Sequence, residues 1–342
     1  MAAAVPEKTK AAPYRLDCLN TSQKRDIARK SNRAVNTVLR YFSLSRYLRE
    51  RFGGPVAKIS LDAGLSCPNR DGTLSRRGCI FCDEKGSGTG AARSGLGLEE
   101  QIGRGLVRMK NRAEKFIAYF QSFTNTYAPL ETLKEMWDTA LAPESVVGLS
   151  IGTRPDCLPD ETLDLLESYV KNYEIWLELG LQSASDQTLA FINRGHTAAD
   201  FARAVSRAQG RGIKILAHVI IGLPHEEERE ILATADFIAR LNLDGVKIHS
   251  LYVSRGTELA GMYRRGCFQC LSQERYADLA VRFLEAIPST MVIHRLTGDP
   301  DPATLLAPGW SRNKHQTIAL IRQRLEERDT WQGRKLGAAR PC

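Results

Sequence analysis

The chain has 342 residues, of which 43% are hydrophobic and 25% charged, a composition typical of globular proteins. It contains no apolar run of about 18 residues, which excludes a membrane span, and residues 1–14 lack the apolar stretch of a signal peptide. The net charge of +9 lies within residues 1–60, which carry thirteen Lys/Arg and four Asp/Glu.

The first predicted unit is a basic N-terminal arm, residues 1–45, which we expect to be partly flexible. Its charge fits a polyanionic partner such as a nucleic acid, and Tyr41 is available for stacking. The segment is equally typical of a solvated amphipathic helix, because apolar residues recur at helical spacing from Val35 to Phe42. Charge alone leaves both interpretations open.

Beyond the arm, predicted strands and helices alternate six or seven times. Strands are predicted at 56–61, 115–121, 146–151, 174–182, 213–221, 245–253 and 291–296. Helices are predicted at 98–109, 129–142, 160–170, 185–192, 198–209, 226–241, 272–286 and 313–328. Such alternation implies parallel strands with right-handed crossovers. The fold class is therefore α/β, either a doubly wound sheet or a partial (β/α) barrel.

Three of the eight cysteines lie on one loop, CPNRDGTLSRRGCIFC, after the first predicted strand. Cys79 and Cys82 have the Cys-x-x-Cys spacing that lets two thiolates reach one metal or cluster, and eleven residues separate them from Cys67. A closed zinc site needs four ligands, whereas a 4Fe–4S cluster held by three thiolates keeps one iron free. A zinc site and plain buried thiols remain alternatives. Irregularly spaced cysteines in a chain of this length favour metal or redox chemistry in a reducing cytoplasm over a disulfide framework.

In both candidate folds, ligands bind at the carboxyl ends of the strands. Polar residues and glycines gather there in this sequence, among them Gln121, Ser122, Thr124, Thr153, Arg154, Asp156, Glu178, Gly180, Gln182, Gly222, Lys247 and His249. Residues two apart in a strand share a face, so Glu178, Gly180 and Gln182 point the same way. Because a buried carboxylate is costly without a partner, this pattern predicts a polar ligand beside Glu178.

Together these segments resemble radical S-adenosylmethionine (SAM) enzymes. The resemblance covers about Tyr47 to Trp310 and rests on CPNRDGT…GCIFC, YFQSFTNTY, GTRPDCLPD, WLELGLQS, NRGH, HVIIGLP and LLAPGW. The chain looks most like the MnmL/YhcC-like branch, which is related to the radical domain of the Elongator catalytic subunit and to oxygen-independent coproporphyrinogen oxidase. The superfamily usually has three residues between its first two cysteines, where this chain has eleven. The resemblance implies a partial (β/α)6 TIM-like barrel at 46–300, flanked by the arm and by a C-terminal extension at 301–342.

The resemblance also implies site roles. Cys67, Cys79 and Cys82 are expected to ligate a 4Fe–4S cluster whose open iron takes the amine and carboxylate of SAM. The expected SAM contacts are Gln121, Ser122, Thr124, Thr153, Glu178, Gln182, Arg194, His218 and Gly222. Among these, Arg194 matches a position that pairs with the methionyl carboxylate, and Gln182 matches one that contacts the ribose. The expected substrate contacts are Arg154, Asp156, His196 and His249.

In such enzymes, one electron from a donor such as flavodoxin or ferredoxin cleaves SAM to methionine and a 5′-deoxyadenosyl radical, which abstracts hydrogen from a C–H bond. Members of this branch are implicated in tRNA wobble-uridine modification, in which a carboxymethylaminomethyl group is trimmed to aminomethyl. The basic arm agrees with a tRNA partner.

Two other hypotheses remain. The first is a radical SAM enzyme that acts on a small molecule or peptide. The second is a zinc-stabilised RNA-binding protein in which Cys79 and Cys82 share a metal with Cys267 and Cys270. By itself the second Cys-x-x-Cys is more typical of packed or surface thiols, and Cys157 of a half-buried turn cysteine than of a hydrogen-atom donor.

Overall fold

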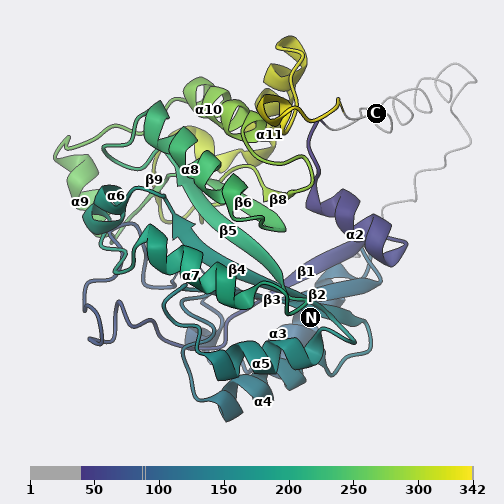
Figure 1. The fold of residues 1–342 in the computed structure, drawn as a ribbon. Helices are drawn as coiled ribbons and strands as arrows, with labels where there is room; N and C mark the ends of the chain where they lie inside the picture. The colour runs from purple at the N-terminus through teal and green to yellow at the C-terminus, as the bar shows by residue number, and fades with distance from the viewer. Residues whose placement is uncertain (1–39, 87, 89, 341–342) are drawn as a thin grey trace, which may run out of the picture. The chain divides into compact units, whose positions relative to one another are not determined.

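The sheet consists of seven parallel strands: β1 (Val56–Leu61), β2 (Lys115–Phe120), β3 (Val146–Thr153), β4 (Glu174–Gln182), β5 (Lys214–Ile221), β6 (Gly245–Ser250) and β8 (Val292–Arg295). This computed structural model describes residues 40–86, 88 and 90–340. The sheet is curled into a half-barrel, and its strand order follows the chain without the reversal of a doubly wound sheet (Figure 1). The predicted α/β class and partial barrel are therefore confirmed.

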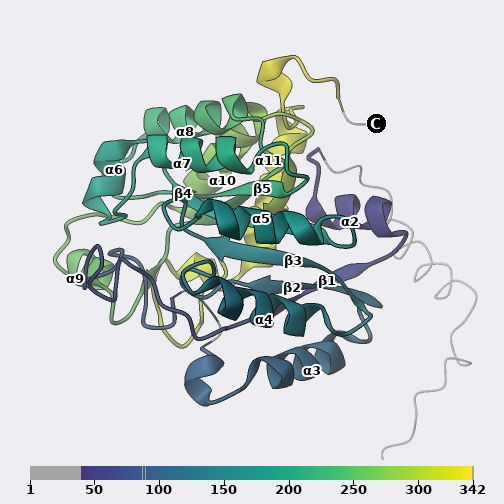
Figure 2. The ribbon, with the colours of Figure 1, turned by 60° about the horizontal axis from the view of Figure 1, so that its bottom comes forward.

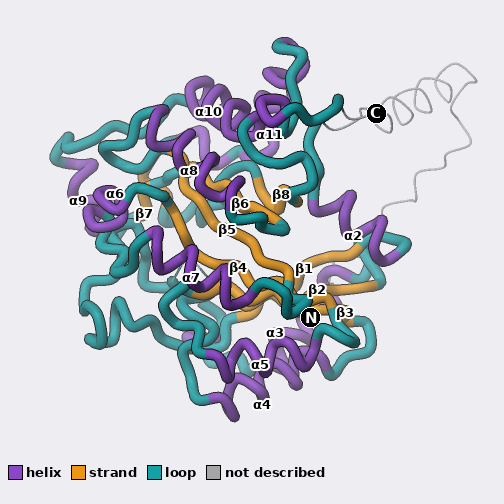
Figure 3. Tube along the Cα trace, in the orientation of Figure 1, coloured by secondary structure: helices purple, strands orange, loops and turns teal. Residues whose placement is uncertain are grey.

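Helices between successive strands cover the outer side of the sheet, and further helices precede the first strand and follow the last (Figures 1 and 2). They are α2 (Leu44–Phe52), α3 (Leu98–Met109), α4 (Leu130–Leu141), α5 (Asp160–Tyr169), α6 (Asp186–Phe191), α7 (Ala198–Ala208), α8 (Glu228–Arg240), α9 (Glu258–Arg264), α10 (Gln273–Glu285) and α11 (Lys314–Glu327). Three short 3-10 helices lie at Ala92–Ser94, Gly309–Arg312 and Arg334–Leu336. Figure 3 shows the strands in orange with the purple helices around them.

Alternation along the strands separates an apolar outer face from a polar inner face. On β4, Leu177 and Leu179 are fully buried on the side covered by α5 and α7. Glu178 and Gly180 alternate with them and line a cavity on the concave side. The strand is buried on both faces, which explains why, after Glu174 at its start, it reads as a near-continuous apolar run interrupted by the carboxylate of Glu178.

The amino ends of the strands are closed by aromatic packing. Trp176, Leu216 and Val292 form a core cluster, against which Phe42 and Tyr47 pack. Phe42 precedes α2 and is not part of it. Most of the arm, including the expected helical positions up to residue 39, lies outside the described residues. The half-barrel is thus sealed at this end, so ligands must enter from the carboxyl ends of the strands.

The predicted strand at 245–253 is wrong in its extent. β6 ends at Ser250, and Val253–Ser254 form a separate strand, β7, antiparallel to β9 (Leu305–Ala307). The Leu251 amide still donates to Ile221, but the chain then leaves the parallel sheet. The apolar sequence continues through the break, so periodicity could not reveal it. Neither β9 nor α9 was predicted.

The segment after residue 300 packs on the rest of the described chain. β9 pairs with β7, and α11 packs against α10. The domain limits at 45 and 300 stay predictions. No helix in the described part of the chain combines the length and apolar character needed to cross a membrane.

Candidate active site

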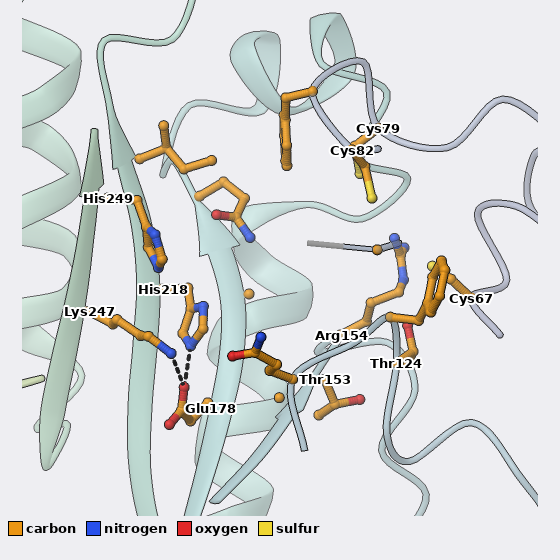
Figure 4. A pocket seen from close by; sticks show the side chains of 18 of the residues that line it. Cys67, Cys79, Cys82, Thr124, Thr153, Arg154, Glu178, His218, Lys247 and His249 are labelled. Atoms are coloured by element: carbon orange, nitrogen blue, oxygen red, sulfur yellow. Dashed lines mark hydrogen bonds and ion pairs between the residues drawn. The ribbon is translucent and has the colours of Figure 1, made fainter. Parts of the chain in front are cut away.

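A cavity of about 330 Å³ opens on the concave side of the sheet at the carboxyl ends of its strands. Most of the predicted site residues line it: Cys67, Cys79, Cys82, Gln121, Thr124, Thr153, Arg154, Glu178, Gln182, Arg194, His218 and His249. Figure 4 shows the three cysteines toward one end and Glu178, His218, Lys247 and His249 toward the other. The structure thus joins the cysteine loop and the strand-end residues in one site.

Hydrogen bonds tie the cysteine loop to the segment that follows α6. The Arg70 guanidinium donates to the Cys82 carbonyl at 2.7 Å, which fixes the end of the loop. Asn193 donates to the Gly78 carbonyl at 2.6 Å and receives, on its own carbonyl, the Asn69 amide at 2.6 Å. Gly78 has a φ of 72°, in the left-handed region that favours glycine. The loop is therefore held in one conformation with its cysteines on the cavity wall.

The sulfur atom of Cys79 faces hydrogen-bond donors. Cys79 Sγ lies 3.5 Å from Asn69 Nδ2 and 3.6 Å from Arg194 Nη1. Burial, and then the charge of the neighbouring Cys79, raise the pKa of the Cys82 thiol to about 12. Thiols that resist ionisation on their own become thiolates when a metal centre supplies positive charge.

Unpartnered polar atoms line the same part of the cavity. Thr124 Oγ1 and Arg194 Nε are buried, and neither has a hydrogen-bond partner among the described residues. In the described ranges, no three His, Cys, Asp or Glu side chains converge as ligands of a single metal ion. A 4Fe–4S cluster makes a different demand, because each of its cysteines binds a different iron. The residues present therefore fit a cluster with a polar ligand beside it better than a zinc ion shared by Cys79, Cys82, Cys267 and Cys270.

The Arg194 side chain is held against β4 by contacts with Gly180. Its Nη2 donates to the Gly180 carbonyl at 2.8 Å, and a Cβ at Gly180 would collide with the guanidinium. The His196 ring lies 3.0 Å from the same carbonyl, and its pKa is lowered to about 3 by burial and by the charge of Arg194. His196 is thus neutral. Its ring contacts the Gly180 carbonyl on β4 and does not line the cavity.

Three other predicted residues also lie off the cavity wall. Asp156 accepts a two-pronged ion pair from Arg154 at 2.7 and 2.9 Å, so it orients Arg154, which does line the cavity. Ser122 is buried, and Gly222 has a φ of 97° with its α-carbon toward Leu271. Past a strand end the chain turns, and the two-residue rule no longer says which way a side chain points.

Glu178 is the centre of a buried charge network. Its carboxylate receives Lys58 at 2.7 Å, Lys247 at 2.9 Å and His218 at 2.6 Å, and the Ser150 hydroxyl as well. Burial alone would raise the pKa of Glu178, but the charges of Lys247 and Lys58 and the hydrogen bond from His218 outweigh it and hold the pKa well below its usual range. Glu178 is therefore ionised.

Sequence reasoning left several members of this network out of the predicted site. Lys58, Tyr119, His294 and Arg295 were not recognised, and Lys247 was noticed at a strand end but given no role. Tyr119 Oη receives the Lys247 ammonium at 2.6 Å. The available signal was a lysine in the middle of a strand that is otherwise apolar or small, as at Lys58 and Lys247, since such a charge needs a buried partner.

Acid is expected to destabilise the fold between about pH 6.5 and pH 4. Burial, and then the charge of Lys247, lower the pKa of His218 from 6.5 to about 4. In this window the unfolded chain binds a proton at His218 that the folded chain does not, so His218 contributes a fall of about 3 kcal/mol in the free energy of unfolding as the pH falls. Urea unfolding at several pH values measures this fall. His218→Gln keeps a donor to Glu178 and should lose that part of the pH dependence; an unchanged slope would contradict the assignment.

Comparison with known proteins agrees with this geometry. The model of the Radical SAM superfamily matches residues 73–238, and that of the Radical_SAM C-terminal domain matches residues 243–327. YtqA of Bacillus subtilis (strain 168) is 42% identical over 87% of this chain and 94% of its own length. The chain belongs to the radical SAM superfamily. Enzymes of this superfamily use SAM and a 4Fe–4S cluster and need a reductant, so the predicted cofactors are confirmed.

A further relative and a solved structure extend the comparison. YhcC of Escherichia coli (strain K12) is 39% identical over 85% of this chain and 93% of its own length, which confirms the predicted branch. The archaeal Elp3 of Methanocaldococcus infernus, with residues 1–46 deleted, has a TM-score of 0.63 and 17% identity. That alignment covers 81% of this radical SAM chain and 64% of the archaeal one, and shows that the two share a fold.

Proposed function

We propose that this radical SAM enzyme trims the carboxymethylaminomethyl group of a tRNA wobble uridine to aminomethyl. The observation that carries the proposal is one cavity with three cysteines at one end and a buried charge network at the other. The space between them suits a short polar group that must meet a cofactor in isolation from water. The relationship to the Elongator subunit and the charge of residues 1–60 favour an RNA substrate over a small molecule or peptide.

The roles of the chain's own residues follow from their positions. Cys67, Cys79 and Cys82 would hold the 4Fe–4S cluster, which, with an electron from flavodoxin, ferredoxin or a similar cytoplasmic donor, would supply the reductive chemistry for cleaving SAM. Arg194 offers a guanidinium to the methionyl carboxylate, because forked donors match two carboxylate oxygens. Thr124, whose hydroxyl has no partner among the described residues, offers a further hydrogen bond. The sealed amino end of the barrel excludes water from the far side of the cavity.

Loss of this protein is expected to change the modified nucleosides of tRNA. Cells that lack it should accumulate 5-carboxymethylaminomethyluridine at the wobble position and lose the aminomethyl form, as measured by mass spectrometry of digested tRNA. Cells complemented with the wild-type chain are the control and should regain the aminomethyl form. Unchanged tRNA nucleosides, together with no salt-sensitive affinity of the purified protein for tRNA, would favour a small-molecule or peptide substrate instead.

A further inference from the structure

The cavity has a charged group that the cysteine and strand-end motifs leave unexplained. Arg295, the last residue of β8, lines the cavity, and its side chain makes no hydrogen bond or ion pair with any described residue. Its register neighbour in the sheet is Lys247 on β6, which is buried and lines the cavity too. His249, one inward-facing position further along β6, has a buried Nε2 with no partner in the described part of the chain. We call Arg295, Lys247 and His249 the cationic end of the cavity.

Positive charge exceeds negative charge around the cationic end. Lys58 and Lys247 share a single carboxylate, Glu178, and Arg295 adds a third positive charge, which acts on Lys247. Asp299 also lines the cavity, but it pairs with Lys314 at 2.7 Å. An enclosed excess of positive charge is costly without a counter-charge, so an anion is the missing partner.

The charge of Arg295 helps to lower the pKa values of its neighbours Lys247 and His249. Burial lowers the pKa of Lys247 to about 7; Glu178 opposes this change, and the charge of Arg295 adds to it. Burial, and then the charge of Arg295, hold the pKa of His249 well below its usual range, so His249 is a neutral imidazole. A neutral imidazole can donate one N–H to an anion without adding charge.

We propose that the cationic end is a subsite for a carboxylate carried by the substrate. The inference rests on the proposed function, in which the group that is trimmed ends in a carboxylate. Arg295 supplies the forked donors that match a carboxylate, and His249 supplies a further N–H. Lys247 and His249 lie across the cavity from the cysteines (Figure 4), so a carboxylate held beside them places the carbon atoms attached to it toward the cysteines.

The position of the cationic end argues against two other anions. The carboxylate of SAM belongs with Arg194, whose guanidinium is 3.6 Å from Cys79 Sγ, whereas Lys247 and His249 lie toward the opposite end (Figure 4). An RNA phosphate sits on a bulky sugar backbone, whereas Lys247 is only 5% exposed inside the half-barrel. A short side group that ends in a carboxylate reaches this depth.

Direct binding tests the subsite without tRNA. The probes are the nucleoside 5-carboxymethylaminomethyluridine and its carboxamide, which have the same shape and no phosphate. Their dissociation constants for the full-length, cluster-loaded protein with SAM are measured by isothermal titration calorimetry. The acid is expected to bind about ten- to a hundredfold more tightly than the amide, as a charge-assisted hydrogen bond to a partly buried arginine predicts. Equal affinities, or no binding of either nucleoside, overturn the subsite.

Variants assign the preference to Arg295. Arg295→Gln is expected to bring the two affinities within about threefold, whereas Arg295→Lys, which keeps the charge, retains part of the preference. Arg264→Gln removes an exposed arginine from α9 outside the cavity and should change nothing. SAM affinity should be the same in all four proteins; a loss of SAM affinity in Arg295→Gln with the acid preference intact would instead assign Arg295 to the cofactor and overturn the proposal.

The two failures are distinguishable. An acid preference that depends on Arg295, together with unchanged tRNA nucleosides in cells, keeps the carboxylate subsite and rejects the tRNA function. Altered tRNA nucleosides, together with equal binding of acid and amide, keep the function and reject the subsite.

Discussion

Protein carrying Cys79→Ser, reconstituted with iron and sulfide without oxygen, is expected to form at least about 1000-fold less 5′-deoxyadenosine than the wild type, because the cofactor carries the chemistry. Cys79 is buried and lies beside both Asn69 and Arg194, so its sulfur is the best-enclosed of the three. A serine hydroxyl stays protonated and cannot replace a thiolate. Chemical analysis should give about four iron and four sulfide per wild-type chain and much less in the variant.

Variants at other cysteines serve as controls. They test whether iron binding requires Cys79 in particular or is lost when any cysteine is replaced. Cys157 is buried and its pKa is raised to about 12 by burial, but it does not line the cavity, so Cys157→Ser should keep its iron. The double variant Cys267→Ser, Cys270→Ser should also keep its iron and its activity. If that double variant lost a bound zinc ion while the wild type held no iron, the zinc-stabilised RNA-binding hypothesis would replace the enzyme.

The part of the site at the carboxyl ends of the strands could be predicted from the sequence, because parallel strands place all their carboxyl ends at one edge of the sheet. Cys67 follows β1, Thr153 ends β3 and Gln182 ends β4, and each lines the cavity. Strand order was not needed for this prediction. Any right-handed α/β arrangement would have brought these residues to the same side of the sheet.

The charge network around Glu178 could not be predicted from the sequence. It depends on how strongly the sheet curls, and no local sequence pattern encodes that curvature. β1 and β8 are the two edge strands, yet Lys58 Nζ lies 3.4 Å from His294 Nδ1 across the inside of the half-barrel. Lys58 and Glu178, 120 residues apart in the chain, meet for the same reason. Sequence reasoning identified Glu178 as a carboxylate that required partners, but it expected a ligand where the structure has two lysines and a histidine.

Side chains beyond the strand ends were the weakest predictions. Asp156 and His196 were expected on the cavity rim, but Asp156 pairs with Arg154, and His196 contacts the Gly180 carbonyl on β4. Both lie on turns, where backbone direction changes at each residue. A polar residue near a strand end thus predicts where the site lies, whereas the role of that residue depends on which side chains and backbone groups it contacts.

Replacing Glu178 with Gln is expected to lower the free energy of unfolding by about 3–5 kcal/mol, the cost of breaking a buried ion pair by removing one partner. Both carboxylate oxygens accept from cations, and the amide nitrogen of Gln would face a lysine with a second donor. Urea unfolding followed by circular dichroism measures the change. Glu100→Gln breaks an exposed pair with Arg104 on α3 and should cost less than about 1 kcal/mol.

A double-mutant cycle then tests whether the network acts as one unit. Lys247→Met alone leaves Glu178 with Lys58 and His218, whereas in the Glu178→Gln background it removes a buried cation that has lost its counter-charge. Lys247→Met should therefore lower the free energy of unfolding less in the Glu178→Gln background than in the wild type. The expected coupling energy is about 1–3 kcal/mol. A coupling below about 0.5 kcal/mol would mean that Lys247 does not depend on Glu178, and the low pKa of Glu178 would then need another cause.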